Sequence, residues 1–170
     1  MNAKPERIYL VGMPGSGKST SGPLLARLLG WTFGDLDARI ASVEGASVAD
    51  LFARGGEASF REAETRTLHA TLAEKSLVLA TGGGTVLQNM DWMLKAGTVV
   101  WLDLPMDLLL KQLGPQAGRR PLLLHLNTGE MELKLWDLYR SRLPLYSRAH
   151  CRVQGTRELL EWGEQIRYLP

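Results

Sequence analysis

The fold is decided by the stretch Gly12-Met13-Pro14-Gly15-Ser16-Gly17-Lys18-Ser19, which matches the pattern G-x-x-x-x-G-K-[ST]. An apolar run at 8–11 predicts a buried strand before it, and the leucine spacing of 20–29 predicts a helix after it. This pattern between a strand and a helix is typical of a phosphate-binding loop. Glycine has no Cβ and adopts positive φ, so successive backbone N–H groups of such a loop can point at one anion. A turn that only packs is the alternative, and the flanking strand and helix disfavour it.

The chemistry of this loop predicts a nucleoside triphosphate as the ligand. The helix that follows adds unpaired backbone N–H groups and partial positive charge at its N-terminus. Lys18 is placed to reach the β- and γ-phosphates as a point charge, and the Ser19 hydroxyl is placed to ligate Mg²⁺. The predicted nucleotide-binding residues are Gly15, Ser16, Gly17, Lys18, Ser19 and Thr20.

Length, charge and cysteine content set the class of protein. A chain of 170 residues predicts a single domain over residues 1–170 with its own hydrophobic core. The net charge of +2 is too small to indicate nucleic acid or an acidic membrane surface as a partner. Cys151 is the one cysteine of the sequence, which excludes an internal disulfide and fits a reducing compartment. Residues 1–7 are polar, and no apolar run reaches the ~18 residues of a membrane span. We expect a soluble, cytoplasmic monomer.

Short apolar runs alternate with helical patterns along the chain, which predicts a parallel sheet covered by helices. The predicted strands are 8–11, 31–33, 76–81, 99–102 and 151–153. The predicted helices are 20–29, 39–44, 47–74 with an interruption at 55–56, 89–96, 106–113, one from 128 that ends or bends at Pro144, and 156–167.

Two further strand ends carry unusual residues. Ligands of open parallel sheets gather at the carboxyl ends of the strands. Asp35 and Asp37 follow the second predicted strand and are expected on one side of it. They fit either helix N-caps or, for one of them, an Mg²⁺ site that acts through water. Gly82–Gly84 follow the third strand and fit either a tight turn or a close approach of backbone to a ligand.

Several arginines could bind an anion. Arg61 and Glu64 lie three residues apart on a predicted helix, where they form either a surface salt bridge or an oriented fork for a carboxylate. Arg119 and Arg120 lie in a basic loop in which a cation could close over a transferring phosphate. Arg142 adds positive charge near the end of the next helix, and taken singly such arginines are usually solvated.

Together these features resemble the shikimate kinase family over nearly the whole chain. The loop alone indicates only a nucleoside triphosphate, whereas its combination with the other runs is far more specific. The matching runs are GMPGSGKST (12–20), FGDLD (33–37), LFARGGEASFREAE (51–64), TGGGTV (81–86), RRPLL (119–123) and RLPLY (142–146).

The resemblance implies both a fold and a reaction. The implied fold is a single-domain P-loop NTPase with a five-stranded parallel sheet, in the order 2-3-1-4-5, flanked by helices. It includes a mobile lid at about 113–127 and a shikimate-binding region at about 35–64. The implied reaction is transfer of the ATP γ-phosphoryl group to the 3-hydroxyl of shikimate, with Mg²⁺, in the biosynthesis of aromatic amino acids.

The resemblance also implies roles at the nucleotide end of the site. Lys18 contacts the β- and γ-phosphates, and Ser19 binds Mg²⁺ with Asp35 in the outer coordination sphere. Arg120, in the lid, covers the transferring phosphate. The family places a basic residue against adenine shortly before this arginine, whereas the present chain has Lys111-Gln112-Leu113-Gly114-Pro115 there. Lys111, Arg119 and the backbone near 155–156 are the alternatives for adenine.

At the acceptor end, the resemblance implies a carboxylate clamp and a base. Arg61 and Arg142 bind the shikimate carboxylate, with Glu64 orienting Arg61. Asp37 binds shikimate hydroxyls and accepts the proton of the attacking one. The backbone of Gly82, Gly83 and Gly84 approaches the ring.

Two other functions fit parts of the sequence. Another small-molecule kinase, for gluconate or a nucleoside monophosphate, would share the phosphate-binding loop, but an aspartate facing an arginine suits an acid better. A binding protein without catalysis should lack at least one of the reactive side chains. All of them are present in this chain, namely Lys18, Ser19, Asp37, Arg61 and Arg120.

Overall fold

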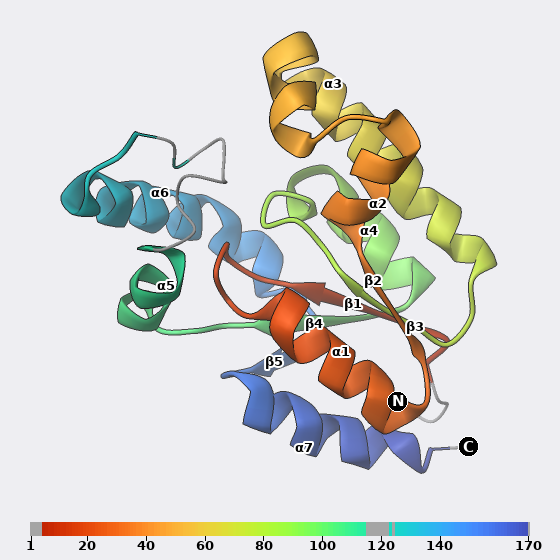
Figure 1. Ribbon diagram of the computed structural model, residues 1–170. Coiled ribbons are helices and arrows are strands. Elements are labelled where there is room, and N and C mark those ends of the chain that lie inside the picture. Colours follow the sequence, from red (N-terminus) through yellow and green to blue (C-terminus); the bar gives the residue numbers. More distant parts are fainter. Residues whose placement is uncertain (1–4, 115–122, 124, 170) are drawn as a thin grey trace.

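Five strands form one parallel sheet in the order β2-β3-β1-β4-β5, which confirms the predicted fold. The computed structural model describes residues 5–114, 123 and 125–169 (Figure 1). The elements are β1 Arg7–Val11, α1 Lys18–Leu29, β2 Thr32–Asp35, α2 Leu36–Glu44, α3 Val48–Ala70, η1 Thr71–Ala73, β3 Leu77–Ala80, α4 Val86–Ala96, β4 Thr98–Leu102, α5 Met106–Leu113, α6 Thr128–Tyr146, β5 Cys151–Val153 and α7 Thr156–Arg167.

The register of the strands brings three functional strand ends together. Leu10 of β1 pairs with Ala80 of β3, and Ala80 pairs with Asp35 of β2. Beyond this row, the backbone N–H of Thr81 donates to the Leu10 carbonyl at 3.1 Å. The phosphate-binding loop, the β2 end and the glycines after β3 therefore leave the sheet side by side.

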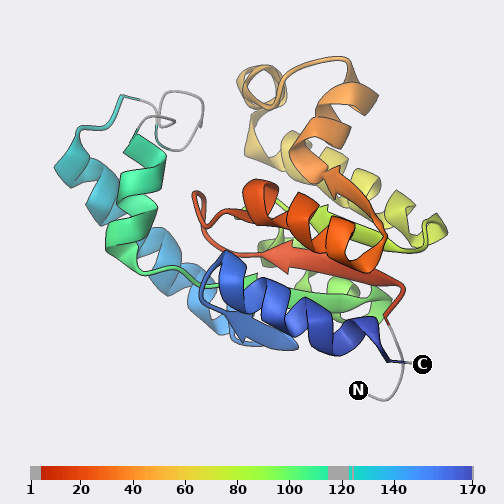
Figure 2. The same ribbon diagram turned by 60° about the horizontal axis from the view of Figure 1, so that its bottom comes forward.

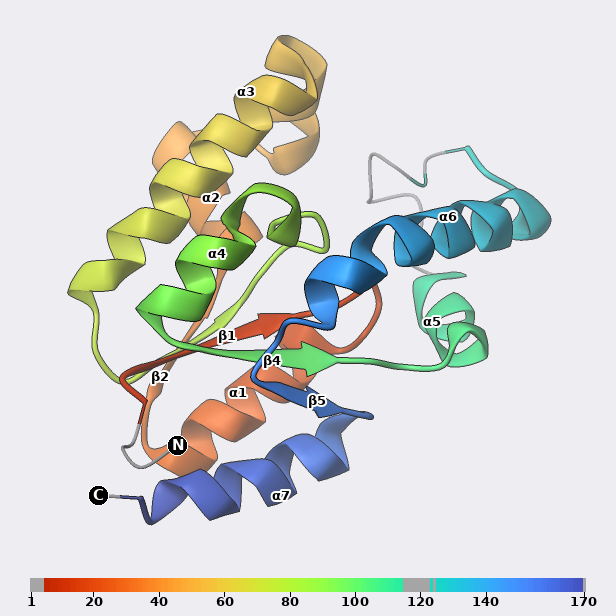
Figure 3. The same cartoon turned by 180° about the vertical axis from the view of Figure 1, so that it is seen from behind.

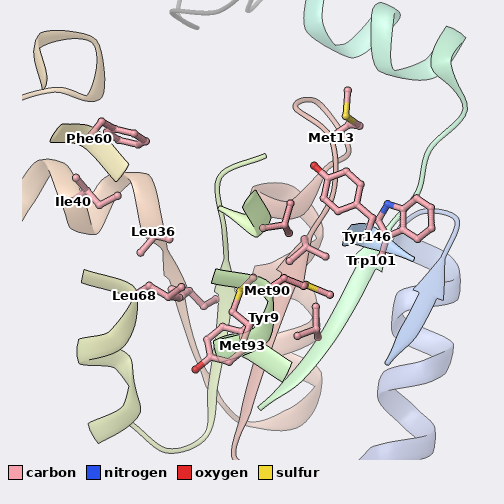
Figure 4. Packing of buried hydrophobic residues seen from close by; sticks show 14 of the residues in the cluster. Tyr9, Met13, Leu36, Ile40, Phe60, Leu68, Met90, Met93, Trp101 and Tyr146 are labelled. Carbon is pink, nitrogen blue, oxygen red and sulfur yellow. The ribbon is translucent and has the colours of Figure 1, made fainter. Parts of the chain in front are cut away.

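Alternate residues of each strand pack on opposite faces of the sheet, as expected when both faces are covered. Ile8 and Leu10 face a core shared with α1 and α7, whereas Tyr9 and Val11 face a core shared with α2 to α6. Figure 2 shows α1 and α7 lying together on their face, and Figure 3 shows α4 and α6 on the other face, in front of the sheet in that view. The larger core runs from α2 and α3 past β1 to α6 (Figure 4).

Two helices begin three residues earlier than the sequence pattern predicts. α2 begins at Leu36 because the Asp35 side chain accepts a hydrogen bond from the Ala38 N–H and caps the helix. Asp37 therefore lies in the first turn of a helix and not on an extended strand end. α4 begins at Val86, directly after the glycines. The predicted interruption of α3 is confirmed at Gly56, whose φ of 71° is left-handed.

α6 continues through Pro144 to Tyr146, and α7 begins and ends where predicted. Within the described part of the chain, no helix combines the length and the apolar character needed to cross a membrane.

Candidate active site

A polar pocket of about 120 Å³ lies at the carboxyl ends of β1, β2 and β3. The phosphate-binding loop forms one wall of the pocket. Asp35, Asp37 and the glycines after β3 (82–84, the glycine loop) form the other walls, and α5 contributes one residue. The lining residues are Gly15, Gly17, Lys18, Ser19, Thr20, Asp35, Asp37, Thr81, Gly82, Gly83 and Gln112. All predicted nucleotide-binding residues that the structure describes, except Ser16, thus line one cavity.

The phosphate-binding loop has the backbone conformation that its glycines predict. Gly15 and Gly17 have φ values of 79° and 87°, which other residues rarely adopt. The Lys18 Nζ donates to the carbonyls of Gly12 and Met13, both at 2.9 Å, and to Ser16 Oγ at 3.2 Å. The loop therefore holds its lysine at the centre of its own backbone, where an entering phosphate would meet the ammonium group.

The groups expected for Mg²⁺ lie next to each other. Ser19 Oγ donates to Asp35 Oδ2 at 2.6 Å, while Asp35 Oδ1 caps α2. The two alternatives for Asp35, a helix cap and a metal-site residue, are thus compatible. The described residues include no cluster of three or more His, Cys, Asp or Glu side chains suited to a metal. A hydroxyl with a nearby carboxylate fits Mg²⁺, which keeps several waters and completes its shell with substrate phosphates.

Asp37 faces the same pocket from the first turn of α2. Its Oδ1 lies 3.3 Å from the position that a Cβ on Gly82 would occupy. Its carboxylate is therefore close to both the glycine loop and the phosphate-binding loop.

Arg61 and Glu64 form a buried ion pair, which excludes the surface salt bridge as an interpretation. Arg61 Nη1 donates to Glu64 Oε2 at 2.7 Å, and the exposed fractions of the two residues are 6% and 0%. Glu64 Oε1 accepts from the Thr85 hydroxyl at 2.6 Å. On its other side Arg61 Nη2 donates to Glu57 Oε1 at 3.2 Å. Glu64 therefore has both oxygens occupied and holds the guanidinium in one orientation.

A second buried guanidinium, that of Arg142, comes from α6, and its residue is 3% exposed. Its Nη1 lies 3.1 Å from the position of a Cβ on Gly83, and a Cβ on Gly84 would overlap the Arg61 guanidinium. Side chains at these glycines would thus block both arginines. Among the residues that the structure describes, none is a hydrogen-bond partner of Arg142 Nε, Arg142 Nη1 or Arg61 Nε. Buried donors of this kind usually have a partner, and a carboxylate suits a guanidinium fork.

Three residues of the site were not among the predicted site residues. Thr81 and Thr85 join the network around the glycines, and their positions on either side of the glycines in the run TGGGTV could have indicated them. Gln112 reaches the pocket from α5 and carries no local signal in the sequence. Arg119 and Arg120, predicted for the lid, lie outside the described residues.

Comparison with known proteins assigns the family. The family model described as shikimate kinase matches residues 14–166. The chain belongs to the shikimate kinase family. It is 48% identical to shikimate kinase from Gloeobacter violaceus over 149 residues, which cover 87% of this chain and 82% of that protein.

Solved shikimate kinases share the fold over almost the full length. The structure from Bacteroides thetaiotaomicron has a TM-score of 0.86 and 32% identity, and the match covers 95% of both chains. The enzyme from Acinetobacter baumannii in complex with shikimate has a TM-score of 0.84 and 39% identity, covering 95% of this chain and 90% of that chain. The present chain is therefore a kinase that uses ATP with Mg²⁺.

The buried pair gives a test of which glutamate supports Arg61. Replacing Glu64 with glutamine leaves a buried guanidinium without its charged partner, so Glu64→Gln should lower the free energy of unfolding by about 3–5 kcal/mol. Glu57→Gln removes the solvent-exposed partner and should change it by less than about 1 kcal/mol. Urea denaturation of both variants measures the difference. Equal losses would contradict the assignment of Glu64 as the main support.

Proposed function

We propose that this chain transfers the γ-phosphoryl group of ATP to the 3-hydroxyl of shikimate through the residues around the polar pocket. The observation that carries this proposal is the pair of buried guanidinium groups, Arg61 and Arg142, beside the glycine loop and next to the aspartate of the phosphate pocket. A substrate with a carboxylate at one end and hydroxyls at the other fits this arrangement. The family of the chain supports the same substrate.

At the nucleotide end, the backbone N–H groups of the loop and Lys18 would hold the β- and γ-phosphates. The residues proposed for this are Gly15, Ser16, Gly17, Lys18, Ser19 and Thr20. Ser19, with Asp35 acting through water, would hold Mg²⁺, which when bound neutralises the phosphate oxygens. Phosphoryl transfer needs positioning and charge neutralisation more than covalent chemistry, so rigid groups of this kind account for most of the catalysis.

At the acceptor end, Arg61 and Arg142 would bind the shikimate carboxylate from two sides. The backbone of Gly82, Gly83 and Gly84 would lie against the ring, since the absence of side chains there leaves room beside both arginines. Asp37 would then bind the acceptor hydroxyl and accept its proton as the oxygen attacks phosphorus. Fixing the carboxylate and the hydroxyl together aligns the nucleophile with the γ-phosphate.

The lid completes the proposal. Residues 113–127 would close over the bound substrates, with Arg120 against the transferring phosphate. Closure excludes water, which would otherwise accept the phosphoryl group.

We propose one domain over residues 1–170, with the shikimate-binding region at 35–64. We also propose a cytoplasmic monomer without nucleic-acid or membrane partners, supported by the small net charge and the single free cysteine.

An acceptor panel tests the function. ADP release, followed by a coupled assay, should be fastest with shikimate and at least about 100-fold slower with AMP, which has no carboxylate for the clamp. Quinate and gluconate have a carboxylate and hydroxyls on carbon frames of a different shape, and should be phosphorylated more slowly than shikimate. Turnover of gluconate or AMP in preference to shikimate would favour another kinase. Absence of ADP release with all four would favour a binding protein.

The carboxylate clamp predicts a selective loss of acceptor affinity. Arg61→Lys keeps a positive charge next to Glu64 but loses the bidentate fork, and should raise the KM for shikimate by about 10- to 100-fold. The KM for ATP should stay within about twofold, since no nucleotide contact changes. Arg66→Lys, an exposed substitution on the same helix, is the matched control. Equal rises of both KM values would contradict the clamp.

The proposed base predicts a different signature. Asp37→Asn keeps the size of the side chain but removes the proton acceptor, so kcat should fall by at least about 100-fold. Nucleotide affinity, measured by calorimetric titration with ADP, should be preserved. A kcat within a fewfold of the parent enzyme would remove Asp37 as the base.

A further inference from the structure

Tyr146, the last residue of α6, connects this helix to the glycine loop. Its hydroxyl donates to the Gly83 carbonyl at 2.7 Å, and its side chain is fully buried. We propose that Tyr146 is a positioning residue for shikimate, which acts by fixing the peptide between Gly83 and Gly84. This inference rests on the proposed function and adds a residue to it.

The peptide geometry explains how a hydroxyl outside the pocket can act within it. No described peptide bond is cis, so the carbonyl of Gly83 and the N–H of Gly84 point in opposite directions from one rigid plane. Tyr146 holds the carbonyl towards α6 and thereby turns the Gly84 N–H away from α6. Glycines have many accessible backbone conformations, and this loop therefore needs an external restraint to keep one of them.

The ring of Tyr146 is itself held in place. It stacks on Trp101 of β4, with 5.7 Å between ring centroids and an interplanar angle of 20° (Figure 4). The Arg152 guanidinium of β5 lies 4.9 Å from the centroid of the Trp101 ring and pairs with Asp103 at 2.5 Å. The hydroxyl therefore extends from a stack that is anchored to two strands of the sheet.

Tyr146 remains a hydrogen-bond donor under all working conditions. Burial raises the pKa of its phenol to about 12, and the neighbouring Arg142 guanidinium only partly opposes the rise. The neutral phenol keeps its proton at physiological pH, so the Gly83 carbonyl has a constant partner.

The contact also couples the two sides of the proposed clamp. Arg142 lies one turn before Tyr146 on α6, and its Nη1 approaches Gly83. On the other side of the loop, the Thr85 hydroxyl is tied to Glu64, which holds Arg61. The glycine loop is therefore fixed at Gly83 by α6 and at Thr85 by α3. Loss of the α6 contact should loosen the loop without disturbing the phosphate-binding loop.

Tyr146→Phe tests this inference because it keeps the stacked ring and removes only the hydroxyl. The variant should raise the KM for shikimate by about three- to tenfold, as expected for the loss of one buried hydrogen bond. The KM for ATP should stay within about twofold. Amide hydrogen exchange followed by NMR should become faster at Gly84 by a similar factor, with exchange in α7 unchanged. Tyr168→Phe, which removes the hydroxyl of an exposed tyrosine after α7, is the control and should leave all of these values unchanged.

The outcomes separate the inference from the proposed function. Failure of the parent enzyme to phosphorylate shikimate would overturn the proposed function, and the exchange rate at Gly84 would still report on the restraint. A folded Tyr146→Phe enzyme with an unchanged KM for shikimate would overturn the inference. So would a uniform rise in exchange, or equal rises of both KM values, since these indicate only a general loss of stability.

Discussion

The parallel arrangement of the sheet is the constraint on which the site depends. Because all five strands run in the same direction, the ends of β1, β2 and β3 emerge at one edge. β3 lies between β2 and β1, so the glycine loop is placed between Asp35 and the phosphate-binding loop. Segments separated by about 70 residues in sequence thus form one pocket, and each needs only a short loop to reach it.

The charged groups beside this pocket are buried, and burial of a charge is unfavourable unless it is compensated. Arg61 is compensated by Glu64, whose second oxygen accepts from Thr85. Within the described part of the chain, the Nε and Nη1 of Arg142 have no hydrogen-bond partner. These buried donors lie in a region of low dielectric, where the carboxylate of the proposed substrate would interact with them more strongly than in water.

Glycines serve two different purposes in the site. In the phosphate-binding loop they supply the left-handed conformations of Gly15 and Gly17. After β3 they leave space, because a side chain on Gly83 or Gly84 would collide with Pro14 or with the two arginines. The glycine loop is flexible by itself, and two contacts from outside restrain it: the Tyr146 hydroxyl on one side and the Thr85–Glu64 hydrogen bond on the other. The active site is therefore shaped as much by α3 and α6 as by the sheet.

The sequence by itself determined the parallel sheet, the phosphate-binding loop and most of the candidate residues. These depend on local patterns: apolar runs of strand length, the glycine spacing, and an arginine and a glutamate three residues apart. Only the tertiary structure decided that Arg61 and Glu64 are buried, that Asp35 caps α2 and leaves Asp37 in a helix, and that Gln112 and Tyr146 reach the site. Burial and long-range contacts depend on how distant elements pack, and a side chain such as Tyr146 has the same local sequence whether it meets solvent or the Gly83 carbonyl.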